Sequence, residues 1–383
     1  MGRIKEMTTE NMLLNILKGS LNNEIYKTEE SFDLEKIASL AKTHGVLQCV
    51  AYYVSKLTDE QKPAENVREY LSQVLLQESM RSENQLYAVD CIQKQCEASG
   101  IDTLVVKGAV TKKRYSDPFL RSMSDIDVLY KTQQHNEFKK VMFALGYTDY
   151  REGRKNDTYN MPPFISVEAH RSLLANESEY FDYYSDVWNR CLLKNGCKHT
   201  YEMKIEDEFI FNIIHLAEHF KHGGVGIRFI MDVYVYDNLD IDRGYFENEL
   251  KKLNLYDFYL NISALSEYWF ANGESTELIE KLSSFVLSNE IFGTKENKAA
   301  LYVSEGRVSG LLRTCFPEYE DMKSMYLWLD GRRYLLPYAW LHRAFKSLIY
   351  RRGNVKAQLS KAKNGDMDKG KELKAFYKEC GLR

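Results

Sequence analysis

Two aspartates stand inside an apolar segment of this chain. The segment reads SDIDVLY, and a single isoleucine separates Asp125 from Asp127. Aspartate is depleted in strands and rarely buried without a partner, so this pair contradicts the local propensity. Because strand side chains alternate between faces, both carboxylates should project from one face while Ile126 and Val128 enter a core. Two close carboxylates repel each other unless a cation lies between them, and Mg²⁺ prefers such hard oxygen ligands.

A third acidic residue lies in a later segment, FISVEAHR. Its apolar residues Ile165, Val167 and Ala169 alternate with polar ones, which predicts a strand with Glu168 and His170 on its other face. A two-metal phosphoryl-transfer site needs a further carboxylate near the first pair. Glu168 is therefore the candidate for the third metal ligand.

The residues before the aspartates offer groups that bind anions. The strand-like run DTLVV ends at Lys107 and Gly108 and leads directly into a short helical pattern. Backbone N–H groups at such a turn attract phosphate, and Lys107 adds a cation. Arg121, four residues before Asp125, could add a forked donor to the same polyphosphate. The sequence thus predicts phosphate binding beside the metal site.

The surrounding patterns divide the chain into three zones. Residues 1–100 place apolar residues three and four apart, which predicts an N-terminal helical region. Residues 101–175 alternate short strand and helix patterns, and residues 176–383 are helical in pattern again. The expected fold class is α+β, with a small mixed β-sheet core between an N-terminal and a larger C-terminal helical region. The expected strands cover residues 102–108, 122–131 and 163–173.

Composition limits the classes of protein to which the chain can belong. Its residues are 44% apolar and 13% aromatic, which is enough to build hydrophobic cores. No apolar run approaches the roughly 18 residues of a membrane span, and the N-terminus lacks a secretory signal pattern. We therefore expect a cytoplasmic protein without a membrane partner. Seven cysteines without a C-x-x-C pair indicate neither a disulfide framework nor a zinc ribbon.

Charge is unevenly distributed, although the net charge is only −3. Residues 331–383 carry 14 Lys and Arg against 4 Asp and Glu, a local +10, which leaves 38 against 51, or −13, for the first 330 residues. Such a basic tail could contact nucleic acid or an acidic partner. It could equally be a solvated basic helix without a partner, since no aromatic or glycine-rich RNA signature accompanies it.

Taken together, these motifs resemble the nucleotidyltransferase superfamily, which has the DNA polymerase beta-like fold. K-G before the short helix and R-x-x-S-D-I-D-V-L after it look like a group of uncharacterised bacterial nucleotidyltransferases. The later runs VEAHRSL and HLAEHFKHGGVGIRFIMDV are similar to that group as well, and CFPEYEDMKSMYLWLDGRRYLLPYAWLHR is so more loosely. The core motifs span about 70 residues, and the weaker similarities reach most of the chain.

The resemblance implies an enzyme that moves a nucleoside monophosphate from a nucleoside triphosphate to a hydroxyl acceptor. Mg²⁺ or Mn²⁺ would be held by Asp125, Asp127 and Glu168, and Glu168 could instead take the proton from the acceptor. The acceptor stays open among a small molecule, a protein and RNA. The phosphate-binding residues implied are Lys107, Gly108, Arg121 and Ser124.

A competing motif lies in HLAEH, residues 215–219. His215 and His219 have the H-x-x-E-H spacing of inverted zinc metallopeptidases and would share one helix face. His215 could instead pack in a helical core. A further interpretation makes this helix a wall of the nucleotide cleft, with Arg228 and Asp232 as an i, i+4 pair on the same wall. Possible wall residues are His170, His215, His219, Arg228 and Asp232.

A non-enzymatic alternative uses the same fold. A catalytically weak member would serve as a nucleotide sensor or an interaction module. All three acidic residues are present, so the sequence shows no loss of catalysis. Metal-dependent nucleotide turnover would separate the enzyme from the sensor.

Overall fold

The structure is a computed structural model that describes most of the chain. Within it, one compact unit comprises Met1–Ala217 with Val225–Ile291, and a second comprises Glu218–Gly224 with Phe292–Arg383. The three-zone division expected from the sequence stays a prediction. The described residues are 8–27, 32–58, 62–152, 156–163, 165–175, 177–304, 316, 319, 322, 326–329, 331–350 and 366–382, with the side chains of 345–350 left aside.

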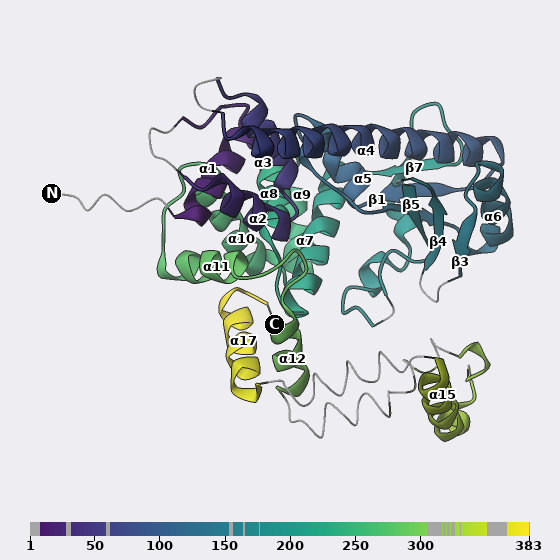
Figure 1. Cartoon of the computed structure of the whole chain (residues 1–383). Helices are drawn as coiled ribbons and strands as arrows, with labels where there is room; N and C mark the ends of the chain where they lie inside the picture. The colour runs from purple at the N-terminus through teal and green to yellow at the C-terminus, as the bar shows by residue number, and fades with distance from the viewer. Residues whose placement is uncertain are drawn as a thin grey trace. The chain divides into compact units, whose positions relative to one another are not determined.

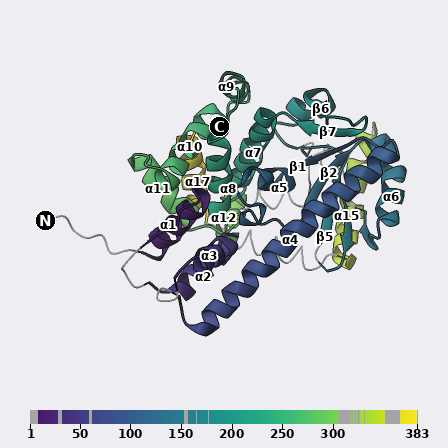
Figure 2. The same cartoon turned by 90° about the horizontal axis from the view of Figure 1, so that it is seen from above.

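Four helices begin the first unit (Figure 1). They are α1 (Thr9–Leu21), α2 (Leu34–Thr43), α3 (Leu47–Ser55) and α4 (Glu65–Ala98). The side chains of Thr8 and Asp33 accept hydrogen bonds from backbone N–H groups of the first turns of α1 and α2, which fixes where both helices start. Figures 1 and 2 show α4, with its 34 residues, reaching from α3 across to the sheet.

A mixed sheet of seven strands forms the core, in the order β3-β4-β5-β2-β1-β7-β6 among the described residues. β2 lies near its centre, antiparallel to β1 and parallel to β5. The strands are β1 (Thr103–Val106), β2 (Ile126–Tyr130), β3 (Asp149–Arg151), β4 (Asn156–Met161), β5 (Ile165–His170), β6 (Cys191–Leu193) and β7 (Thr200–Met203). The short helix α5 (Gly108–Thr111) follows β1, and α6 (His135–Ala144) follows β2.

One face of this sheet builds the hydrophobic core. Ile126 and Val128 of β2, with Val167 and Ala169 of β5, pack against α4 and α6 on that face. Because strand side chains alternate, Asp127 is directed to the opposite face. The apolar side chains of Ile126 and Val128 thus fix the strand in the core, while Asp127 shares the opposite face with the buried Leu129.

The expected α+β class is confirmed, but the sheet is larger than the sequence analysis expected. β3 and β4 were not predicted, and β6 and β7 lie beyond residue 176, where the pattern looked helical. β6 and β7 have only three and four residues, which is too short for alternation to stand out. β7 nevertheless pairs in parallel with β1 and extends the sheet.

Helices follow the sheet. They are α7 (Ile205–Lys221), which continues into the second unit, α8 (Ile227–Asp237), α9 (Arg243–Lys252), α10 (Tyr256–Phe270) and α11 (Glu277–Leu287). Stacked aromatic rings hold several of them together, with Phe209 and Phe246 4.4 Å apart between ring centroids. Short 3₁₀ helices are Lys112–Arg114, Pro118–Leu120, Thr132–Gln134, Asp182–Tyr184, Val187–Arg190, Leu327–Leu329 and Arg333–Leu335.

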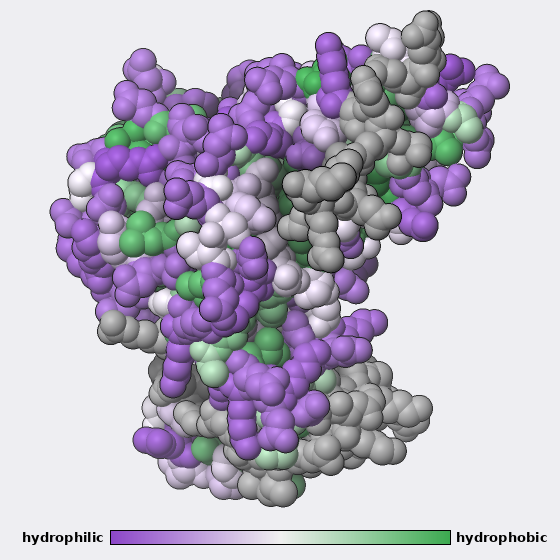
Figure 3. All heavy atoms as spheres, turned by 90° about the vertical axis from the view of Figure 1, so that its left-hand side faces the viewer, coloured by the Kyte–Doolittle hydropathy of each residue, from purple (hydrophilic) through white to green (hydrophobic). Residues whose placement is uncertain are grey.

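The second unit contains α12 (Lys295–Val303), α15 (Leu336–Tyr350) and α17 (Met367–Glu379). α12 and α17 pack so closely that a Cβ atom on Gly370 would lie 2.3 Å from the carbonyl oxygen of Ala300. Part of the basic tail, residues 351–365, lies outside the described residues. No helix in the described ranges is both long and apolar enough to cross a bilayer. Hydrophilic residues cover most of the face shown in Figure 3.

Candidate functional site

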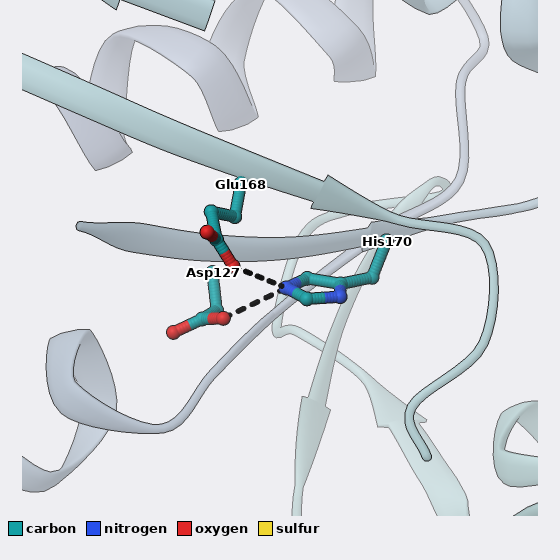
Figure 4. A group of neighbouring side chains, drawn as sticks. All are labelled: Asp127, Glu168 and His170. Carbon is teal, nitrogen blue, oxygen red and sulfur yellow. Dashed lines mark hydrogen bonds and ion pairs between the residues drawn. The ribbon is translucent and has the colours of Figure 1, made fainter. Parts of the chain in front are cut away.

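Two acidic residues face each other across the centre of the sheet. Asp127 is the second residue of β2, and it pairs in register with Val106 of β1 on one side and Glu168 of β5 on the other. His170 follows Glu168 by two residues and so shares its face of β5. Figure 4 shows the side chains of Asp127, Glu168 and His170 converging at this point.

The contacts between these side chains are close. The Nε2 atom of His170 lies 2.7 Å from Oδ1 of Asp127 and 3.6 Å from Oε2 of Glu168. The Nζ atom of Lys107 lies 2.5 Å from the same Oδ1 of Asp127. Asp127 is buried, with 5% of its surface exposed, so these partners compensate a carboxylate that water barely reaches.

The two carboxyl groups have pKa values shifted in opposite directions. Burial favours a higher pKa for Asp127, but the hydrogen bond from His170 and the charge of Lys107 outweigh it and lower the pKa. Burial raises the pKa of Glu168, and the charges of Asp125 and Asp127 raise it further. Asp127 is therefore held as a carboxylate, while Glu168 is the group that more readily takes up a proton.

This arrangement suits a divalent cation. The ligand atoms of Asp127, Glu168 and His170 all lie within 4.8 Å of one another. Among the described residues, these three side chains form the group that could hold a metal ion. Two carboxylates with one imidazole form a donor set that divalent metals accept, with the oxygen ligands favouring Mg²⁺ or Mn²⁺. An added cation would also relieve the charge repulsion that raises the pKa of Glu168.

Asp125 lies just before β2, which begins at Ile126. The sequence predicted a strand over residues 122–131 that contained both aspartates, whereas β2 begins four residues later, at Ile126, and leaves Asp125 outside it. Ser124 donates a hydrogen bond from Oγ to Oδ1 of Asp125 at 2.9 Å. The charge of Asp125 still raises the pKa of Glu168, but Asp125 does not belong to the metal-capable group of Asp127, Glu168 and His170 found among the described residues.

The Lys107-Gly108 turn brings its lysine back to the acidic pair. Lys107 has φ +54°, a conformation that a residue with a side chain adopts rarely and that often marks a functional position. Gly108 begins α5, and a Cβ atom there would lie 3.1 Å from Cβ of Met123. The turn is therefore tightly packed, and it directs the ammonium group of Lys107 toward Asp127.

Arg121 makes a buried ion pair with Asp232 of α8. Its Nη2 atom lies 2.8 Å from Oδ2 of Asp232, its Nε donates to both carboxylate oxygens, and Tyr115 donates to the same carboxylate at 2.7 Å. The sequence had paired Asp232 with Arg228 along the helix. In the structure Arg228 donates from Nη1 to the carbonyl of Ser122. The phosphate contact expected for Arg121 stays a prediction.

The histidines of HLAEH are placed in different compact units. The ring of His215 lies beside Phe211 and Phe229, with centroids 6.4 and 5.8 Å away, and that of His219 lies 4.9 Å from Phe292. Neither histidine belongs to the metal-capable group found in the described part of the chain. The structure therefore gives no support to the zinc peptidase interpretation.

Sequence reasoning did not anticipate the ion pair between Lys107 and Asp127. The pair forms because Lys107 directly follows Val106, the strand partner of Asp127, and this pairing is visible only in the structure. The burial of Lys112 was also unforeseen, since the run KKR is typical of a helix surface. Its Nζ donates to Oε1 of Gln85 on α4, at 3.2 Å.

Comparison with known proteins supplies independent evidence. A family model described as an uncharacterised nucleotidyltransferase matches residues 30–271, a stretch that includes all seven described strands and more than half of the chain. The search of curated proteins and the search of solved structures each found no match. The chain belongs to this family of uncharacterised nucleotidyltransferases.

Proposed function

We propose that the protein transfers a nucleoside monophosphate from a nucleoside triphosphate to a hydroxyl group of an acceptor. The observation that carries this proposal is the pair Asp127 and Glu168, in register on adjacent central strands of a chain in a nucleotidyltransferase family. Asp125, Asp127 and Glu168 are the residues that would hold Mg²⁺ or Mn²⁺. The cation would neutralise charge on the phosphates and on the leaving pyrophosphate.

The transfer forms one bond to the α-phosphorus and breaks another. The acceptor oxygen forms a bond to the α-phosphorus, the bond between the α-phosphorus and its bridging oxygen to the β-phosphate breaks, and pyrophosphate leaves with the electron pair. The hydroxyl proton must pass to a base. Glu168 is suited to that role where Asp125 and Asp127 alone hold the cation, because burial and the neighbouring carboxylates raise its pKa.

The other residues of the site would bind the phosphates or support the carboxylates. Lys107 is a mobile point charge that can exchange its contact with Asp127 for a phosphate oxygen. Gly108 and Ser124 flank the same position, at the end of β1 and the start of β2. His170 keeps Asp127 oriented and ionised. The acceptor class, the preferred base and the role of the basic tail stay open in this proposal, and a cytoplasmic location stays a prediction.

The test is transfer of label from each of the four α-labelled nucleoside triphosphates with Mg²⁺, in the presence and absence of cell extract. Wild type is compared with the double variant Asp125→Asn, Asp127→Asn and with Asp149→Asn, an exposed aspartate of β3 in the same sheet. We expect transfer and pyrophosphate release with wild type and Asp149→Asn and none with the double variant.

Two outcomes would count against this function. Normal turnover by the double variant would remove the catalytic assignment of the aspartates. Absence of transfer with all four nucleotides, together with metal-dependent nucleotide binding, would favour the sensor alternative.

A further inference from the structure

A cavity of about 330 Å³ lies in the first unit, beside the residues that lead into β2. Its walls come from the end of α2, the middle of α4, the Ser122–Ser124 segment and the first turn of α8. The volume is at the lower end of the range for small-molecule pockets. Ser124 lines the cavity and also donates to Asp125, so the cavity adjoins the segment that leads into β2.

Among the charged side chains on the walls of this cavity, cations outnumber anions. Lys42, Arg81 and Arg228 line it from three different helices, against a single acidic residue, Glu78. Glu78 is engaged by Arg81 itself, with 2.9 Å between its Oε1 and Nη1 of the arginine. Positive charges that converge from separate elements on one concavity attract and hold anions.

Arg228 is placed where a cation is costly. It is the second residue of α8, at the end of the helix where the macrodipole is positive. Burial, and then the charge of the Arg121 guanidinium, lowers the pKa of Arg228 to about 10. An anion in the cavity would offset this cost, and positions that break a local rule are often functional ones.

Asp125 links the cavity to β2 along the chain. It accepts a hydrogen bond from Ser124, which lines the cavity, and it lies two residues before Asp127. A phosphate in the cavity would therefore lie beside the segment that leads into β2.

We propose that this cavity binds an oxyanion group of the substrate, a phosphate carried either by the nucleoside triphosphate or by the acceptor. Arg81 and Arg228 make the forked hydrogen bonds that phosphate accepts, and Lys42 adds a point charge. The proposal rests on the proposed function only in treating the ligand as a substrate. Binding of the anion itself requires neither metal nor turnover.

The test is calorimetric titration of the full chain with inorganic pyrophosphate in the presence of EDTA. Arg81→Gln and Arg228→Gln are compared with wild type and with Arg68→Gln. Arg68 is a matched control, because it lies on the same helix as Arg81 and likewise pairs with a glutamate three residues earlier, in an exposed position. We expect each cavity variant to weaken pyrophosphate binding about tenfold or more and Arg68→Gln to bind as wild type does.

Wild-type affinity in both cavity variants would overturn the proposal. Arg81 is partly exposed, so its replacement keeps the test valid even if Arg228→Gln folds poorly. Glu168→Gln separates this proposal from the proposed function, because it should abolish transfer while leaving metal-free pyrophosphate binding intact. Loss of transfer in Glu168→Gln with unchanged pyrophosphate binding would therefore not contradict the anion site.

A second measurement identifies the source of the phosphate. The KM for the preferred nucleoside triphosphate is determined with Mg²⁺ for the same variants. An increase of about tenfold in both cavity variants would assign the site to the nucleotide. An unchanged KM, with weakened pyrophosphate binding, would assign it to a phosphate group on the acceptor.

Discussion

Removal of the buried carboxylate of Asp232 should destabilise the first unit strongly. Asp232 is 4% exposed, and it accepts hydrogen bonds from Arg121, which is 8% exposed, and from Tyr115. In Asp232→Ala the guanidinium group of Arg121 stays buried without its carboxylate. Removing one partner of a buried pair costs about 3–5 kcal/mol. The lost hydrogen bond from Tyr115 adds about 1–2 kcal/mol.

The expected loss is therefore about 4–7 kcal/mol, a large share of the roughly 5–15 kcal/mol that stabilises a typical domain. Thermal unfolding followed by circular dichroism measures it. At about 2–4 °C per kcal/mol, the Tm of this unit should fall by roughly 8–28 °C. The double variant Arg121→Met, Asp232→Leu should regain most of the loss, because no unpaired charge stays buried.

Glu65→Gln provides the control for this experiment. Glu65 forms an exposed pair with Arg68, and such pairs contribute little, so the Tm should hardly change. A Tm for Asp232→Ala within about 3 °C of wild type would refute the reasoning about the buried pair. The double variant also tests Arg121 as a phosphate ligand, since restored stability with a raised KM for nucleotide would support that role.

Three further predictions concern protonation. His170→Gln should raise the pKa of Asp127, because the imidazole hydrogen bond is the largest contribution that lowers it; carboxyl-carbon NMR titration measures this, and an unchanged pKa would contradict it. If Glu168 is the base, the transfer rate should fall as the pH drops through a pKa above 4.5, and a rate that stays constant there would argue against Glu168. Asp125→Asn should lower the pKa of Glu168, which carboxyl-carbon NMR titration measures without turnover. Burial lowers the pKa of Lys112 from 10.5 to about 8, so between these values the unfolded chain binds more protons than the folded one. The free energy of unfolding should therefore rise with pH from about 8 to 10, by at most about 1.4 kcal/mol per pH unit, and Lys112→Met should show a smaller rise in urea titrations.

Local patterns in the sequence were sufficient for several parts of the site. The alternation of residues 165–170 predicts which face of β5 is buried, and Ile165, Val167 and Ala169 are indeed its buried residues. The apolar residues beside Asp127 likewise predict that Ile126 and Val128 enter a core, which they do, although β2 is buried on both faces. These features depend on neighbours a few residues apart, which a sequence displays directly.

Other parts depend on partners that are distant in sequence. The carboxylate that engages Arg121 lies 111 residues further along the chain, and no local pattern relates the two. The same holds for the cavity, whose cations at residues 42, 81 and 228 come together only in the folded chain. The strand start was predicted at residue 122, four residues before Ile126, because propensity does not resolve the end of an element so finely.

The parallel pairing of β1 with β7 has a consequence for synthesis of the chain. Thr103 pairs with Thr200, so β1 cannot pair with β7 until about a hundred further residues have left the ribosome. Until then the strand presents unsatisfied backbone groups that another chain could add to. A fragment that stops at residue 175 would keep that edge permanently open. Such a fragment should associate through that edge more readily than the full chain does.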